Sequence, residues 1–177
     1  MELSVKKNVG RLTGRIAYTF SRTISRTNGT FPKEQINNNN WFFSNYDRPH
    51  DLSIVSTFQF TKRTYASLNF VYSSGRPTSA PTGNVTISNA VSVPIYGERN
   101  IYRIPDYHRL DFSYTIEQSH KKTQKWRSSW TFSVYNLYGR QNAFSVFFTQ
   151  KPGQGPRANR LAVLARPIPS LTYNFNF

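Results

Sequence analysis

The last seven residues, 171–177, alternate between bulky apolar and polar side chains. Successive side chains of a β-strand point to opposite faces, so this period of two places Leu171, Tyr173, Phe175 and Phe177 on one face. A soluble protein rarely needs so apolar a face on a terminal strand. In a transmembrane β-barrel that face contacts lipid, and the last strand closes the sheet. We therefore interpret these four residues as the lipid-facing side of a barrel-closing strand.

Alternation of the same kind extends along most of the chain. In 108–117, for example, Leu110 and Phe112 share one face while Arg109 and Asp111 share the other. Most of these segments have close to the roughly 9–11 residues that a tilted strand needs to cross a bilayer. The prolines in 166–169 predict a bend, a bulge or the true start of the last strand. The pattern predicts seven strands: 11–21, 51–61, 66–74, 108–117, 126–136, 142–149 and 161–177.

Two architectures fit this alternation, because a soluble sandwich would turn the same apolar faces inward. Two observations favour the barrel. The polar faces carry charges of both signs, and we expect Arg109 and Asp111 to form a salt bridge there. The apolar faces carry Trp and Tyr near strand ends, where amphipathic rings suit a membrane interface. We therefore predict an all-β protein, an antiparallel transmembrane barrel segment of about seven strands.

The connections create a difficulty for this prediction. Short turns are expected at 61–64, 118–125 and 137–141, and long polar segments at 22–49 and 75–107. Long loops of outer-membrane barrels are typically extracellular. If Phe177 ends at the periplasm, however, strict alternation makes 150–160 extracellular and both long segments periplasmic. Those segments are then unusual, or they hide an extra strand, for example around 85–96.

Composition restricts the remaining classes of protein. Mean hydropathy is −0.58, and no stretch predicts a transmembrane helix. The net charge of +15 is the usual sign of a nucleic-acid-binding protein. The basic residues are dispersed, however, without a basic helix, zinc-finger spacing or RNA-binding signature, so we expect no nucleic-acid partner. Residues 1–7 contain no apolar signal-peptide core, and we expect Met1 to be internal to a larger protein.

Four motifs follow one another along the chain: Tyr-Asp-Arg-Pro-His-Asp-Leu-Ser at 46–53, Tyr-His-Arg-Leu-Asp-Phe-Ser at 107–113, Tyr-Asn-Leu-Tyr-Gly-Arg-Gln-Asn at 135–142, and Pro-Ser-Leu-Thr-Tyr-Asn-Phe-Asn-Phe at 169–177. Each motif is weak by itself. Together they resemble the C-terminal end of a TonB-dependent outer-membrane receptor, because their order and spacing match the last strands of that barrel over nearly the whole chain.

The resemblance implies a 22-stranded barrel in the outer membrane of a Gram-negative bacterium, with an N-terminal plug. Such receptors take up scarce ligands such as iron chelates, cobalamin or glycans. We expect 1–177 to be the C-terminal part of such a barrel, a fragment that supplies wall and loops, without a plug or a TonB-binding segment. The expected partners are membrane lipid and the missing strands and plug, with TonB reached only through the absent N-terminal region.

No catalytic, metal or cofactor site is expected, and the chain is not expected to be an enzyme. It has no cysteine, and no nucleophile elbow, phosphate-binding loop or zinc spacing. If the loops contact a ligand, aromatic side chains would stack on a sugar or chelate, and the candidates are Trp41, Phe42, Phe43, Tyr96 and Tyr102. Self-packing of the loops or anchoring at the membrane interface would explain the same residues. A soluble basic β-sheet module that binds nucleic acid or acidic glycans is the alternative function.

Overall fold

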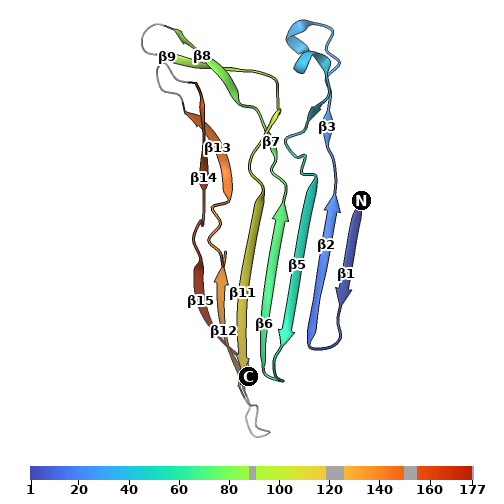
Figure 1. Ribbon diagram of the computed structural model, residues 1–177, viewed down its shortest axis with the longest axis vertical. Helices are drawn as coiled ribbons and strands as arrows, with labels where there is room; N and C mark the ends of the chain where they lie inside the picture. The colour runs from blue at the N-terminus through green and yellow to red at the C-terminus, as the bar shows by residue number, and fades with distance from the viewer. Residues whose placement is uncertain (88–90, 119–125, 150–154, 177) are drawn as a thin grey trace.

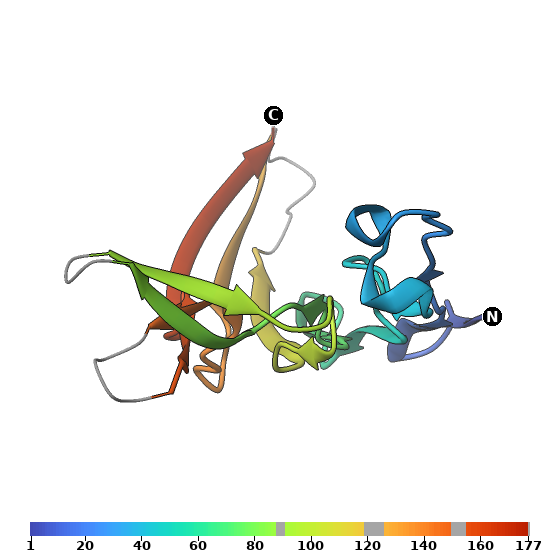
Figure 2. The same ribbon diagram turned by 90° about the horizontal axis from the view of Figure 1, so that it is seen from above.

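A computed structural model describes residues 1–87, 91–118, 126–149 and 155–176 of the chain. Its main feature is an antiparallel sheet of seven strands, in the order β1-β2-β5-β6-β11-β12-β15 (Figure 1). Each strand of this sheet pairs with the next one along the chain, apart from the short strands that lie in the long connections. Seen from above, the sheet is bent rather than flat (Figure 2). The strands are β1 (Glu2–Lys7), β2 (Leu12–Phe20), β5 (His50–Gln59), β6 (Thr64–Ser73), β11 (Tyr107–Glu117), β12 (Arg127–Tyr135) and β15 (Ile168–Asn176).

The alternating segments become strands, but not all of them join this sheet. The prediction that 142–149 continues the sheet is wrong: β13 (Ala143–Thr149) pairs only with β14 (Arg157–Ala162), in a separate hairpin. The segment is apolar on both faces near Phe147, so alternation could not place it. The first strand, β1, escaped prediction because it is short and has only two apolar residues between its ends, Leu3 and Val5.

The prolines of 166–169 mark a strand start, one of the three expected outcomes. Strand β15 begins at Ile168, and Pro169 pairs with Val134 of β12. Proline cannot donate a hydrogen bond, so it is tolerated here because β15 is the last strand of the sheet. Phe177 lies outside the described residues.

The observed strand order, without 142–149 and with β1, places all long connections at one end of the sheet. The connections 8–11, 60–63 and 118–126 join strands at one end, whereas 21–49, 74–106 and 136–167 join them at the other (Figure 1). Because 142–149 is not a strand of this sheet, every connection that precedes it lies at the end opposite to the one predicted by counting back from Phe177. The difficulty raised by the predicted turns therefore disappears, and we call the two ends the short-turn end and the long-connection end.

The long connections form small structures of their own. The first contains β3 (Ile24–Ser25) paired with β4 (Phe42–Phe43), and the 3₁₀ turns Pro32–Glu34 and Asn37–Asn39. The second contains β7 (Pro77–Thr78) paired with β10 (Tyr102–Arg103), and a hairpin of β8 (Pro81–Ile87) with β9 (Val91–Tyr96). The strand expected around 85–96 thus exists as a hairpin outside the main sheet. The β13–β14 hairpin belongs to the third connection.

One face of the sheet is largely apolar. Directly opposed residues of antiparallel strands point to the same side, so the register joins Ile16, Ile54, Phe70 and Leu110 in one row across four strands. The full apolar face comprises Leu3, Val5, Leu12, Ile16, Tyr18, Phe20, Leu52, Ile54, Phe58, Ala66, Leu68, Phe70, Tyr72, Leu110, Phe112, Tyr114, Ile116, Trp130, Phe132, Val134, Pro169, Leu171, Tyr173 and Phe175.

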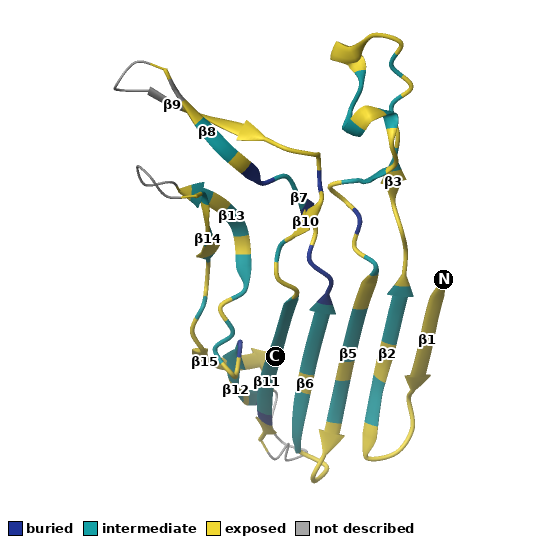
Figure 3. Ribbon diagram, turned by 45° about the horizontal axis from the view of Figure 1, so that its top comes forward, coloured by how far each residue is buried: buried dark blue, intermediate teal, exposed yellow. Residues whose placement is uncertain are grey.

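Nothing in the described part of the chain covers this apolar face. Its side chains are exposed or half-buried, with Leu171 66% and Val5 60% exposed (Figure 3). The buried apolar residues Pro77, Ala80 and Pro81 lie in the second long connection instead. A sheet that is apolar on one face normally buries that face against a second layer. This sheet is a single layer, so the described ranges form no hydrophobic core of the usual kind. None of the described helical segments is long and apolar enough to cross a membrane.

Candidate ligand-binding end of the sheet

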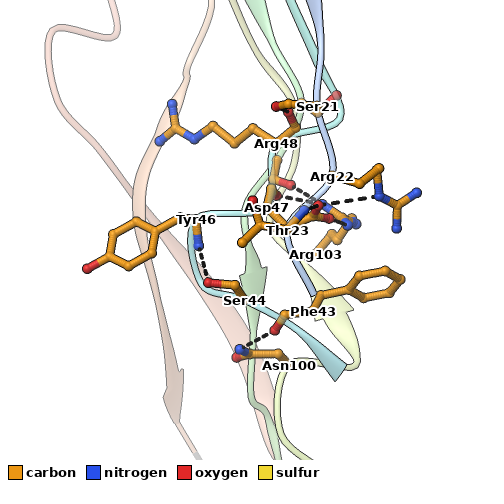
Figure 4. Close-up of polar contacts among 12 residues, drawn as sticks. Ser21, Arg22, Thr23, Phe43, Ser44, Tyr46, Asp47, Arg48, Asn100 and Arg103 are labelled. Atoms are coloured by element: carbon orange, nitrogen blue, oxygen red, sulfur yellow. Dashed lines mark hydrogen bonds and ion pairs between the residues drawn. The ribbon is translucent and has the colours of Figure 1, made fainter. Parts of the chain in front are cut away.

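The long-connection end is organised around the carboxylate of Asp47, which is fully buried (Figure 4). Asp47 Oδ1 accepts a hydrogen bond from the Thr23 amide at 2.7 Å and lies 3.3 Å from Nε of Arg22. Asp47 Oδ2 pairs with the guanidinium of Arg103, which also donates to the main-chain oxygens of Asp47 and Gly75. One carboxylate therefore connects the first long connection to the second.

Burial alone would raise the pKa of Asp47, because it disfavours the charged form. The Thr23 amide and the two guanidinium groups outweigh burial, and they hold the pKa of this carboxyl below its ordinary value. Phe43 completes the cluster: the guanidinium carbons of Arg22 and Arg103 lie 4.7 and 4.9 Å from the centre of its ring. Cations over an aromatic face are attracted by its quadrupole, so Phe43 helps to hold both arginines beside Asp47.

Two asparagines add further links between the same connections. The Asn100 side chain donates to the Phe43 carbonyl at 2.7 Å and to Asn45 Oδ1 at 2.6 Å. The Asn37 side chain forms a reciprocal pair with the main chain of Arg99, at 3.0 and 2.6 Å. Asn37 and Asn100 both adopt positive φ, a conformation that asparagine tolerates better than most residues. These contacts span about sixty positions of sequence and could not be read from it.

The second connection is clamped to its own strands at Gly75. The Gly75 amide donates to Asp106 Oδ1 at 2.8 Å, and the Tyr72 hydroxyl donates to Asp106 Oδ2 at 2.6 Å. The Tyr72 hydrogen bond is the main reason that the pKa of Asp106 lies below its ordinary value. A Cβ atom at Gly75 would lie only 1.7 Å from the Ile104 carbonyl oxygen. Only glycine therefore allows the main chain at position 75 to lie this close to the main chain at position 104.

The third connection is held by Asn136, whose side chain is 1% exposed. Its amide nitrogen donates to the main-chain oxygens of Arg140 and Leu164, and its Oδ1 accepts the Arg140 amide at 3.0 Å. The main-chain amide of Asn136 donates to Asp111 Oδ1 at 2.9 Å. Asp111 in turn forms the expected salt bridge with Arg109, at 2.9 Å. This prediction from the alternation is confirmed.

Replacing Asn136 with alanine should destabilise the third connection by about 2–4 kcal/mol, because it removes three buried hydrogen bonds and leaves their partners unsatisfied. Its φ of +54° adds a cost of about 1 kcal/mol for alanine. Asn136→Gly loses the same hydrogen bonds without this backbone strain, so it should be the milder variant. Hydrogen exchange of segment 136–149 measures both effects. Equal exchange in the wild type and both variants would contradict this account.

The five aromatic residues predicted to contact a ligand all lie in the long connections, but not together. Phe42 and Phe43 are half-buried in β4, where Arg99 lies 5.7 Å from the Phe42 ring. Trp41 is 63% exposed beside Arg26, and Tyr96 and Tyr102 are exposed on β9 and β10. The arginine contacts of Trp41, Phe42 and Phe43 fit self-packing of the loops, the other interpretation of these residues. All five residues stay predicted ligand contacts.

A hollow of about 540 Å³ lies at the long-connection end of the polar face. It is lined by Arg48, Ser74, Gly75, Arg76, Ile104, Pro105, Tyr107, Tyr135, Asn142, Ala143, Phe144, Val163 and Leu164. All three long connections contribute to its wall. Sequence reasoning missed this hollow, because its residues come from distant parts of the chain and show no spacing that a motif could reveal.

The polar groups at 48–51 lie at the start of β5. His50 Nδ1 lies 2.7 Å from the Tyr18 hydroxyl of the neighbouring strand, and Asp51 is exposed. The contact with Tyr18 therefore links β5 to β2 at the long-connection end. Within the described ranges, no group of three or more His, Asp or Glu side chains could hold a metal ion.

Comparisons with protein-family models, curated proteins and solved structures gave no match to this chain.

Proposed function

We propose that this chain is the wall and loops of an outer-membrane β-barrel transporter, with its apolar face against lipid. The observation that carries the proposal is the uncovered apolar face of a single-layered sheet. An apolar surface of this extent is unfavourable in water and marks a contact with a membrane or a partner. Lipid fits this surface, because every strand of the sheet apart from β1 has the length of a membrane-crossing barrel strand, and all seven follow the antiparallel order of such strands.

Two rows of aromatic and histidine side chains border the apolar face and support this orientation. At the long-connection end, Tyr18 and Phe20 contact His50, and His108 contacts Tyr138. At the short-turn end, the rings of Phe58, Phe60 and Tyr114 form one cluster, and those of Trp130, Tyr173 and Phe175 form another. Aliphatic residues and phenylalanines lie between the two rows. Aromatic girdles at both interfaces are typical of transmembrane barrels.

The segregation of the connections supports a direction for the chain. In outer-membrane barrels the short turns are periplasmic and the longer loops extracellular. The three long connections would then face the exterior, and the hydrated polar face would line the inside of the barrel. Seven strands would form part of a larger barrel, since open edges are not tolerated in lipid.

We further propose that the transporter is of the TonB-dependent class, taking up an iron chelate, cobalamin or a glycan. The support is the resemblance of four motifs, and the structure gives three of them a physical role. Motif 46–53 supplies Asp47, motif 107–113 supplies Arg109 and Asp111, and motif 135–142 supplies Asn136, which are the groups that hold the long connections. No residue of this chain is assigned a part in energy coupling.

A spin label on each face tests the membrane assignment. These 177 residues contain no cysteine, so Leu68→Cys and its neighbour Ser67→Cys each introduce one labelling site into them, on opposite faces, with any cysteine elsewhere in the protein replaced by serine. In the protein as the cell makes it, reconstituted in lipid vesicles, the label at 68 should be relaxed by oxygen, which concentrates in lipid. The label at 67 should be relaxed by a water-soluble nickel chelate. Strong relaxation by nickel at position 68 would reject the proposal.

Uptake by whole cells tests the transport class. Deletion of the gene should abolish accumulation of one scarce ligand, and an uncoupler of the inner-membrane proton gradient should have the same effect in the parent strain. Accumulation that is insensitive to the uncoupler would exclude TonB dependence while leaving the barrel intact. The soluble basic module predicts instead salt-sensitive binding to a polyanion by a detergent-free monomer. That alternative leaves the uncovered apolar face unexplained.

A further inference from the structure

The hollow on the polar face has two arginines that lack partners. Arg48 and Arg76 are exposed, and neither side chain makes a hydrogen bond, ion pair or ring contact within the described part of the chain. In Figure 4 the Arg48 side chain points away from Arg22 and from the Asp47 cluster. Arg22, Arg103 and Arg109, by contrast, are all paired with carboxylates. The hollow therefore has two guanidinium groups whose charges are not compensated by any acidic side chain that the structure describes.

The rest of the wall is apolar or neutral. Among the described residues no Asp or Glu lines the hollow, and Ile104, Phe144, Val163 and Leu164 supply an apolar side. Tyr107 and Tyr135 add two aromatic rings, whose hydroxyls are held in place by Arg109 Nη1 at 3.0 and 2.7 Å. An aromatic and aliphatic wall with a few polar groups is the usual construction of a small-molecule site.

We propose that this hollow binds a small molecule with an anionic group, carboxylate or a comparable oxyanion, attached to an aromatic or other apolar body. The fork of a guanidinium group matches the geometry of a carboxylate and can donate two parallel hydrogen bonds. Arg48 and Arg76 bind the anion, and the apolar side of the hollow holds the body. This inference rests on the proposed function, since the hollow would face the water-filled interior near the outer mouth.

Two matched probes test the charge requirement. The probes are 4-(trifluoromethyl)benzoate and the uncharged 4-(trifluoromethyl)benzamide, followed by fluorine NMR with the full protein in detergent micelles. The benzoate should bind, and the benzamide should bind at least about tenfold more weakly, as expected for loss of charged hydrogen bonds. The double variant R48Q/R76Q should weaken benzoate binding by about the same factor.

R63Q/R127Q is the control, because it removes the same two charges at the short-turn end, on the wall of a different pocket. It should leave benzoate binding unchanged. Equal binding of the two probes, or an equal loss with R63Q/R127Q, would overturn the proposal, because either result would mean that binding is apolar or follows net charge alone. The spin labels at positions 67 and 68 test the membrane assignment without reference to benzoate binding. A lipid-facing label at 68 with no preference for benzoate would therefore reject the anion site and keep the barrel.

Discussion

Replacing Phe112 with arginine should lower the stability of the membrane-inserted protein by about 2–4 kcal/mol, the cost of a lipid-facing arginine near the middle of a bilayer. Phe112 lies in the centre of the apolar face, between Leu68 of β6 and Val134 of β12. In the proposed orientation its ring contacts the hydrocarbon core. A guanidinium group at this position loses its hydration, and no described acidic side chain lies on the apolar face to pair with it.

Ser113→Arg is the matched control for this substitution. Ser113 is the next residue of the same strand, and it lies on the polar face between Ser67 and Ser133. An arginine there would remain hydrated inside the barrel, so stability should change little. The measurement is the free energy of folding into lipid vesicles by denaturant titration. If the apolar face were in water, Phe112→Arg would be as mild as Ser113→Arg, and the membrane assignment would fail.

Replacing Asp47 with asparagine should release the first and second long connections from each other. The variant keeps the shape of the side chain but leaves Arg22 and Arg103 without their counter-charge. Breaking a buried pair of this kind costs about 3–5 kcal/mol, and the partial exposure of both arginines reduces the expected effect to about 2–3 kcal/mol. Hydrogen exchange of segments 21–49 and 74–106 measures this free energy of local opening.

Asp51→Asn removes the same charge from an exposed carboxylate nearby and is the control. It should leave the exchange of both segments unchanged. If Asp47→Asn opened them no more than Asp51→Asn does, the Asp47 cluster would not be what holds the connections together.

The same cluster should make the long connections sensitive to acid. The folded-state pKa of Asp47 lies below the ordinary value of about 4, so its contribution is fully present above that value. The contribution should disappear as the pH falls through the lower, folded-state pKa. Wild-type protein should therefore lose protection of 21–49 in acid, whereas Asp47→Asn should show a smaller change over the same range. An identical pH dependence in both proteins would assign the acid sensitivity to other groups.

The sequence by itself determined six of the seven strands of the sheet and their two faces. Alternation requires only that successive side chains point to opposite sides, so the apolar set from Leu110 to Ile116 could be read without knowing any partner strand. The salt bridge between Arg109 and Asp111 followed for the same reason, because two residues on one strand and one face are necessarily close.

Tertiary structure decided which strands join the sheet and what forms at the long-connection end. The segment at 142–149 pairs with β14 rather than β12, and β1 completes the sheet, because pairing depends on partners that local pattern does not identify. The Asp47 cluster and the hollow with Arg48 and Arg76 join residues from separate connections. Their contacts are set by how the chain returns to the same end of the sheet, and a single sequence contains no periodicity that records such a return.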